Sequence, residues 1–426
     1  MTSTGYNSPH PRMISTRQMS QKEGMLPLLL GAASLCLIVL SPASLSPTIP
    51  LASEMKYFRV ILTALIVTVG LMFAKPKFGR HSLVVAPFII FFAGGALWSY
   101  DIDQAIIKKA FFPLSFFSGL IVVICLQSIK GVEDLIKKFA IASSFVAAFV
   151  LVVFYRDPEA NKLHGRLSLE GINANHLAET AAPLFVVAFY AATLRVKNMY
   201  RWVVYSSLAA AVGLVVLFTG SRASLLEMIV GCSVFLFRKL RFSTISSGIL
   251  FAVVAALLYY TYAESLGMNF SRFLSTEDTR SEVWKLGIQK FLNGESLLFG
   301  TGWAHNRYSM GSTNFLSIYL TILIESGIVG SVFFIGCFAT LLLKQYSLLT
   351  KVASVRKRGT LPHLRANLQK IDTFCMCAIG LTMAVLIHGL FESSTMLGST
   401  VNSFALGLAV GLGDQAARFI KNYENQ

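Results

Sequence analysis

Long stretches of apolar residues constrain the fold of this chain more than any other feature. A helix needs about 17 to 25 apolar residues to cross the hydrocarbon core of a bilayer. Twelve runs approach or reach this length, at 25–43, 57–74, 82–100, 110–127, 139–155, 177–194, 202–219, 223–237, 243–262, 326–344, 373–391 and 398–415. Only 14% of the residues are charged, against roughly 25% in a soluble domain. The sequence therefore predicts an all-α polytopic membrane protein with about twelve transmembrane helices.

Lys and Arg indicate which side of the membrane each loop faces, because cytoplasmic loops collect basic residues. With the N-terminus in the cytoplasm, 24 of the 37 basic residues fall in inner segments. We expect the first run to be retained as a helix rather than removed as a signal peptide. The predicted segments are a cytoplasmic tail at 1–24, helices 1–9 within 25–262, a large outer loop at 263–325, helices 10–12 within 326–415 and a cytoplasmic tail at 416–426.

The basic residues do not predict a nucleic-acid face, although the net charge is +16. They are scattered in small groups between the apolar runs, which is typical of topology signals and lipid headgroup contacts. We therefore expect membrane lipids, and no nucleic acid, among the partners. The six cysteines all lie inside apolar runs and form no CxxC pair. This pattern predicts buried thiols, with no disulfide or metal framework.

The large outer loop is predicted to contain its own ordered elements. "STED" at 275–278 forms a capping box, and the following "TRSEVWKLGIQKF" has the apolar stripe of an amphipathic helix at the membrane interface. "LLFGTGW" at 297–303 predicts a glycine-bearing turn. The apolar run at 315–343 would be about 43 Å long as a single helix. We expect it to form two helices, the first capped by Thr313 or Asn314 and broken at Glu325-Ser326-Gly327.

Four arginines are predicted on the outer side, where the charge bias works against them: Arg166, Arg222, Arg280 and Arg307. Arg222 lies in the short connection between the seventh and eighth runs, which predicts a tight helical hairpin. One interpretation is that each arginine extends to a lipid phosphate. The other is that the four converge with His305 on a phosphorylated ligand, because arginine binds phosphate oxygens bidentately and keeps its charge.

Three segments in this order resemble the O-antigen ligase and O-antigen polymerase superfamily of bacterial membrane glycosyltransferases. They are "GRLSLEGINANHLAE" at 165–179, "TGSRASLL" at 219–226 and the late loop from "TRSEVWKLG" to "ESGIVG" at 279–330. The resemblance covers residues from about 165 to 345. It implies a GT-C-like fold in the bacterial inner membrane, with both termini cytoplasmic and the active face and large loop periplasmic.

The resemblance also implies an activity. An O-antigen ligase moves a glycan from undecaprenyl pyrophosphate to lipid A-core, in an inverting reaction that needs no metal or other cofactor. The alternative within the superfamily is a polymerase of O-antigen or exopolysaccharide, which uses another glycan as acceptor. The family arginines that hold pyrophosphate match Arg166, Arg222 and Arg280, and Arg307 is a fourth candidate. Asn175, in the amide-rich "NANH", is a supporting polar residue.

The sequence departs from the family at the catalytic base. Family members have a His-Asn pair about eight residues before the Glu-x-Gly, whereas here the nearest polar pair is Thr313-Asn314 and the pair His305-Asn306 comes earlier. Either an insertion lets His305 fold back as the base, or the base is different or missing. His388, with Glu392 one turn further on, is a second candidate, and we favour a structural polar contact for it. Histidine suits the role because its pKa lies near neutral pH.

Two functions of other classes remain as alternatives. A twelve-span transporter or exporter is disfavoured because its longest loop would join two halves of six spans, and here that connection is only "RVKNMYR" at 195–201. A structural or lipid-scaffolding protein without catalytic activity is favoured chiefly by the missing family histidine.

Overall fold

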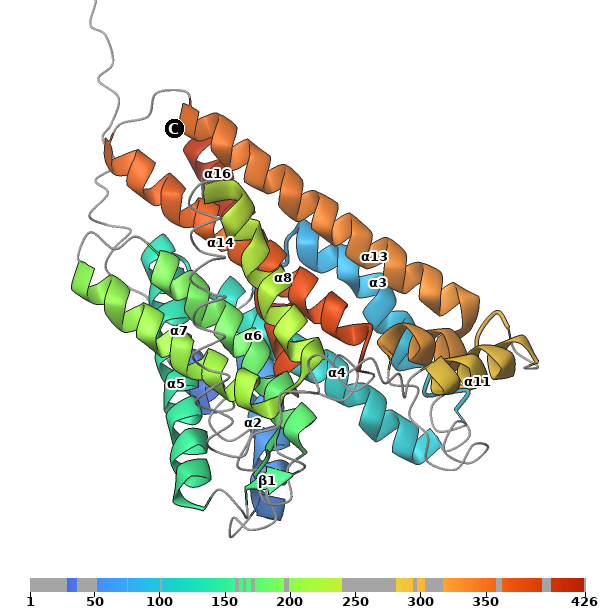
Figure 1. Ribbon diagram of the computed structural model, residues 1–426. Coiled ribbons are helices and arrows are strands. Elements are labelled where there is room, and N and C mark those ends of the chain that lie inside the picture. The colour runs from blue at the N-terminus through green and yellow to red at the C-terminus, as the bar shows by residue number, and fades with distance from the viewer. Residues whose placement is uncertain are drawn as a thin grey trace, which may run out of the picture.

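The computed structural model of the protein describes the following segments: 29–36, 52–74, 76–99, 102–157, 161–163, 166–169, 173–194, 199–239, 281–293, 297–302, 317–357, 362–392 and 400–424. They form a bundle of α-helices with one short antiparallel hairpin (Figure 1). The labelled helices are α2 (Ala52–Ala74), α3 (Arg80–Gly94), α4 (Ile102–Ile124), α5 (Ile129–Arg156), α6 (Ala174–Thr193), α7 (Met199–Thr219), α8 (Arg222–Lys239), α11 (Ser281–Leu292), α13 (Ile318–Lys357), α14 (Pro362–Gly389) and α16 (Thr400–Glu424). The hairpin pairs β1 (Lys162–Leu163) with β2 (Arg166–Leu167).

Four stretches of the described helices are long and apolar enough to cross a membrane. They are Ile129–Arg156, Trp202–Thr219, Ile318–Lys357 and Leu364–Gly389. Shorter apolar helices lie at Phe58–Phe73, Arg80–Gly94 and Lys109–Ile124. The prediction of a helical membrane protein is confirmed at this level. The number of spans stays a prediction, because the run at 243–262 and most of the run at 25–43 lie outside the described residues.

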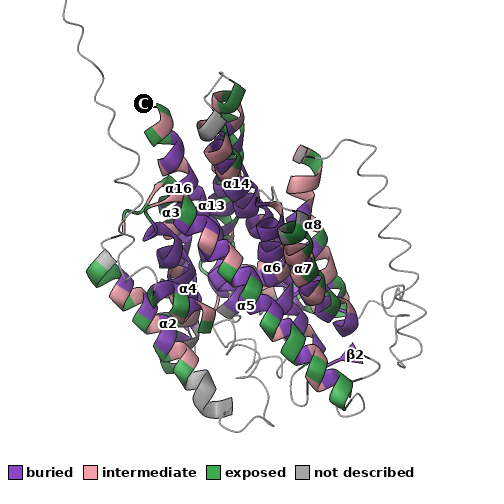
Figure 2. Cartoon of the chain, turned by 90° about the vertical axis from the view of Figure 1, so that its left-hand side faces the viewer, coloured by how far each residue is buried: buried purple, intermediate pink, exposed green. Residues whose placement is uncertain are grey.

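The centre of the bundle is α14, which packs against α6, α8, α13 and α16. Its middle turns, from Phe374 to Ala378, are almost completely buried. The outer faces of the surrounding helices carry exposed apolar side chains such as Leu65 on α2, Phe145 on α5 and Val332 on α13 (Figure 2). A soluble protein rarely exposes large contiguous apolar surfaces, so this distribution fits helices surrounded by lipid.

Glycines allow two of the inner helices to approach very closely. A Cβ atom at Gly119 on α4 would overlap the carbonyl of Phe404 on α16, and one at Gly407 on α16 would overlap that of Phe116 on α4. Small residues at such crossings let helix backbones come into van der Waals contact in a membrane. The α4–α16 pair has the most extensive helix contact in the described part of the chain.

The helix α13 is broken at Gly327, where φ is 66° and ψ is −166°. The segment 297–302 lies against the break and replaces the hydrogen bonds that the helix loses. Thr301 and Gly302 donate their N–H groups to the carbonyls of Ile324 and Glu325, both at 3.0 Å, and the N–H groups of Ile328 and Val329 bond Leu297 and Leu298 at 2.9 and 3.0 Å. The predicted break at Glu325-Ser326-Gly327 and the predicted glycine turn are thus confirmed. The turn supplies the hydrogen bonds that the helix backbone loses at the break.

The other local predictions have mixed outcomes. The amphipathic helix of the outer loop is present as α11, which packs on α13. The turn between α7 and α8 is present at Gly220, whose φ is 61°, but α7 packs mainly on α6 whereas α8 packs mainly on α14. The tight helical hairpin is therefore wrong, because each helix finds a larger partner surface elsewhere. All six cysteines are free; five are buried, as predicted, and Cys36 is exposed.

Candidate functional site

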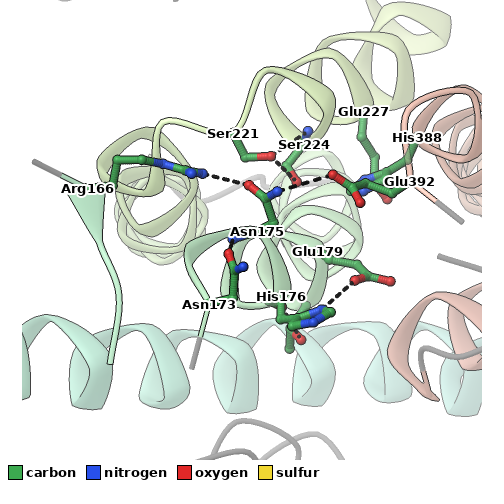
Figure 3. A network of polar contacts seen from close by, with 11 residues as sticks. Arg166, Asn173, Asn175, His176, Glu179, Ser221, Ser224, Glu227, His388 and Glu392 are labelled. Atoms are coloured by element: carbon green, nitrogen blue, oxygen red, sulfur yellow. Dashed lines mark hydrogen bonds and ion pairs between the residues drawn. The ribbon is translucent and has the colours of Figure 1, made fainter. Parts of the chain in front are cut away.

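Arg166 joins two of the motifs that the sequence singled out. It lies on β2, is 8% exposed, and points toward the start of α6 (Figure 3). Its Nε donates to the carbonyl oxygen of Thr219 at 2.6 Å, and its Nη2 donates to Oδ1 of Asn175 at 2.6 Å. The guanidinium also lies against Gly220, the residue with positive φ. Arg166 therefore fixes the turn that leads into α8.

Asn175 extends this network to the end of α14. The side chain of Asn173 caps α6 by accepting the N–H of Asn175 at 2.9 Å, which fixes the first turn of the helix. Nδ2 of Asn175 then donates to Oε1 of Glu392 at 3.2 Å. Three distant segments are thereby connected through one amide, which uses its oxygen toward Arg166 and its nitrogen toward Glu392.

His388 and Glu227 form a buried hydrogen-bonded pair in the same region. Nδ1 of His388 on α14 bonds Oε2 of Glu227 on α8, and the two side chains are 1% and 0% exposed. Nε2 of His388 and Oε1 of Glu227 have no hydrogen-bond partner in the described part of the chain. The charges of Glu179 and Glu392 also act on His388. The structural contact that we favoured for His388 is thus present, and its partner is Glu227.

His176 and Glu179 form another pair at the start of α6, around the beginning of the apolar run at 177–194. Nδ1 of His176 is 3.3 Å from Oε2 of Glu179. About half of the His176 side chain is exposed, whereas Glu179 is buried. The hydrogen bond with Glu179 raises the pKa of His176, and the charge of Glu392 adds to the effect. The region therefore combines buried carboxylates with two histidines, of which His176 is half-exposed and His388 is buried.

The predicted site residues fall into two groups. Arg166, Asn175, His388 and Glu392 form or adjoin one polar network, and Arg222 begins α8 directly after the turn that Arg166 holds. The Arg222 side chain is exposed. Five other predicted residues lie outside the described residues: Arg280, His305, Arg307, Asn306 and Asn314. The convergence of all four arginines therefore stays a prediction.

The geometry changes the role expected for Arg166. We predicted a direct contact with pyrophosphate, but its guanidinium is buried and bonded to Thr219 and Asn175. A ligand would have to displace these charge-assisted hydrogen bonds to reach it. Arg166 is better placed to position the turn before Arg222 than to bind the ligand itself.

Sequence reasoning missed Glu179 and Glu227. Both stand inside or beside apolar runs, and intramembrane carboxylates are rare and usually functional. That signal was present in "NHLAE" and "SRASLLE", but only the packing of α8 on α14 shows that Glu227 meets His388. Glu325, of the predicted Glu-x-Gly, lies apart from this network and has the buried Lys109 amine 3.9 Å from its carboxylate.

The described residues contain no group of three or more His, Cys, Asp and Glu arranged to hold a metal ion. At the candidate site, Arg166 and Asn175 connect Thr219 with Glu392, and the pairs His388–Glu227 and His176–Glu179 lie beside them. A scan against protein-family models gives no match, and no curated protein matches the chain. The functional assignment therefore depends on the motifs and on this network.

Proposed function

We propose that the protein is a membrane glycosyltransferase similar to an O-antigen ligase. It moves a glycan from undecaprenyl pyrophosphate to lipid A-core at the periplasmic face of the bacterial inner membrane. The proposal includes about twelve spans in a GT-C-like arrangement, with both termini cytoplasmic. The observation that carries it is the hydrogen-bonded junction of "GRLSLEGINANHLAE" with the "TGSR" turn, because these are two of the three segments that resemble the superfamily.

In this mechanism the arginines hold the leaving group. An acceptor hydroxyl oxygen attacks the anomeric carbon of the donor, the bond from that carbon to the pyrophosphate oxygen breaks, and pyrophosphate leaves with the bonding electrons. Arg222, with Arg280 and Arg307 from the outer loop, stabilises the charge that develops on the pyrophosphate. Arg166 holds the turn that places Arg222. Attack from the face opposite the leaving group inverts the anomeric configuration.

The proton of the acceptor hydroxyl needs a base. We assign this role to His305, because the sequence predicts an outer loop at this position and the lipid anchor of the donor holds the pyrophosphate at the outer membrane surface. His388 is the second candidate, but its Nδ1 bonds Glu227 and its side chain is 1% exposed. An acceptor glycan has little access to such a group, so we assign His388 a positioning role in the wall behind the site.

Purified protein tests the proposal through transfer of a lipid-linked glycan to lipid A-core. Arg222→Ala should lower the transfer rate about 10²- to 10³-fold, the usual effect of losing one donor that stabilises a leaving charge. Arg222→Lys should recover only part of it, because an ammonium lacks the planar fork. His305→Ala should reduce the rate at least about tenfold with little change in donor binding.

Arg365→Ala is the matched control, because Arg365 is an exposed arginine at the other end of α14. It should leave the rate unchanged. Wild-type transfer by Arg222→Ala would refute the role of the arginines. If His388→Ala abolishes transfer and His305→Ala does not, the base lies on α14.

A deletion strain separates the ligase from its polymerase alternative. Loss of all glycan chains from lipid A-core, with lipid-linked polymer accumulating, indicates a ligase. Cores with a single repeat, or missing exopolysaccharide with normal lipopolysaccharide, indicate a polymerase.

One observation favours a second candidate, a proton-coupled transporter. Glu227 and His388 form an ionisable pair completely buried between α8 and α14, and such pairs mark proton pathways in transporters. Proton uptake by vesicles that contain the purified protein, dependent on Glu227 and on an added solute, would favour transport over transfer.

A further inference from the structure

A cavity of about 730 Å³ lies at the opposite end of the bundle from the Arg166 network. It is an open cavity lined by the segment before α3 and the first residues of α3, the last residue of α4, the second half of α13 and the last turns of α16. The sequence assigns "KPKFGR" at 75–80, the segment 344–371 and the C-terminal residues from 416 to the cytoplasmic side. The fold brings these three basic segments together around one cavity.

Basic side chains dominate the lining. Two carboxylates, Asp414 and Glu424, also line the cavity. The six basic residues around it are Lys77, Arg80, Lys344, Lys351, Arg418 and Lys421. Lys344 and Arg418 are half-buried, and the other four are exposed. Apolar residues, among them Ile124, Leu348 and Ile420, line the rest. The cavity therefore combines a positive rim with an apolar wall.

The two carboxylates are already bonded to protein groups. Asp414 accepts the N–H groups of Gly79 at 3.0 Å and His81 at 2.9 Å, and it also bonds Ser82 and the His81 ring. It thus caps the start of α3, whose first N–H groups have no partner within the helix. Glu424 pairs with Lys351 at 2.7 Å.

The remaining five basic side chains, Lys77, Arg80, Lys344, Arg418 and Lys421, have no ion pair with a carboxylate in the described part of the chain. Two buried polar atoms beside them also have no hydrogen-bond partner there. They are Nε2 of His81 and Oε1 of Gln415, and both residues line the cavity. Gln415 uses its amide nitrogen for the carbonyls of Val123, Ile124 and Leu126 at the end of α4.

Like charges around one cavity repel each other, and partial burial strengthens the repulsion. A ligand with anionic oxygens removes this repulsion, because its oxygens accept hydrogen bonds from the lysine and arginine groups of the lining. The volume lies in the usual range for ligand sites, about 300 to 1,000 Å³. Basic pockets between transmembrane helices near the cytoplasmic side are suited to phospholipid headgroups, because the acyl chains continue along the apolar wall.

We propose that this cavity binds the phosphate headgroup of an anionic phospholipid of the inner leaflet. Lys344 and Arg418, the half-buried cations, contact the phosphate, and Lys77, Arg80 and Lys421 form the rim. The site does not depend on glycan transfer, which the opposite end of the bundle performs in the function proposed above.

Native mass spectrometry of the full-length protein, titrated with cardiolipin and separately with phosphatidylcholine, tests the site. Wild type should bind cardiolipin more tightly than the neutral lipid. The double variant Lys344→Gln, Arg418→Gln should lose about thirty-fold in cardiolipin affinity, given the typical contribution of one basic side chain to anionic lipid binding. The charge-conserving Lys344→Arg, Arg418→Lys should stay within about threefold of wild type.

The matched control is Lys357→Gln, Arg365→Gln. It removes two exposed charges of α13 and α14 that do not line the cavity, and it should lose less than about threefold. Equal losses in the two double variants would overturn the proposal, because they would indicate a general charge effect. Binding of inorganic phosphate that depends on Lys344 and Arg418, without selective cardiolipin binding, would overturn the lipid assignment in favour of a soluble phosphate compound.

Discussion

The two ends of this helix bundle treat charge in opposite ways. Around Arg166 the ionisable side chains have hydrogen-bond partners within the protein: the guanidinium bonds Asn175 and the Thr219 carbonyl, and Glu227 bonds His388. Around the basic cavity, Lys344 and Arg418 have no carboxylate partner in the described part of the chain. The first arrangement fixes side chains in place without a ligand, whereas the second gains partners when an anion binds.

The difference shows what each end contributes. A hydrogen-bonded junction between β2, α6, α8 and α14 keeps the turn before Arg222 in one geometry, as expected for a reaction in which positioning matters. A positive rim over an apolar wall tolerates ligands of variable shape, as expected for lipid contact. In the functions proposed above, the same arginine and lysine chemistry serves two purposes, depending on whether a carboxylate or amide lies within reach.

Topology provides the largest expected effect, because it is all or none. A reporter inserted after Asn293 should be active only as alkaline phosphatase, which works outside the cytoplasm. A reporter inserted after Lys357 should be active only as green fluorescent protein, which fluoresces in the cytoplasm. Both positions end helices in the described part, α11 and α13. The charge count of the loops motivates the assignment. The reverse pattern would exchange the two sides and refute both the periplasmic site and the inner-leaflet lipid site.

Stability gives the next largest contrast between the ends. Glu227→Ala removes the partner of the buried His388 and should lower the free energy of unfolding in detergent by about 3–5 kcal/mol. Lys351→Ala breaks the exposed pair with Glu424, and should change that free energy by less than about 1 kcal/mol. Equal changes in the free energy of unfolding for the two substitutions would contradict the expectation that the buried pair contributes more stability than the exposed pair. Glu227→Gln retains an acceptor for His388 and should fall between them.

The smallest expected effect is a pH dependence at His176. Its folded-state pKa is raised above the ordinary 6.5, so the protonated ring stabilises the folded protein. This contribution is fully present below 6.5 and is lost as the pH rises through the raised folded-state pKa. It should stay below about 1 kcal/mol, because the His176 ring is about half exposed and solvent screens its charge.

Thermal unfolding of wild type and His176→Gln at about pH 5.5 and about pH 9 measures this effect. The difference in midpoint between the two proteins should be larger at the lower pH. A larger difference at the higher pH would contradict the sign. Lys351→Ala, which removes no histidine, is the control for the general effect of pH on the bundle.

Part of the candidate site was predictable from the sequence. Arg166, Asn175 and Arg222 were named from short motifs that resemble a known superfamily and from the unusual position of arginines on the predicted outer side. The hydrogen bond between Arg166 and Thr219 was not predictable, since the two residues are 53 positions apart and meet only when β2 packs against the end of α7. The pairing of Glu227 with His388, 161 residues apart, depends in the same way on α8 packing against α14.

The sequence by itself determined the helical membrane fold, the break of α13 and the amphipathic α11. Each of these follows from the length or periodicity of a continuous run, which acts within a few turns of helix. Only the tertiary structure decided which charges meet. Asp414 caps α3 from 335 residues away at Gly79, while Lys344 and Arg418 face a cavity without a carboxylate partner in the described part. Coulomb and hydrogen-bond energies depend on distances of a few ångströms, and helix packing sets those distances between segments that local patterns leave independent.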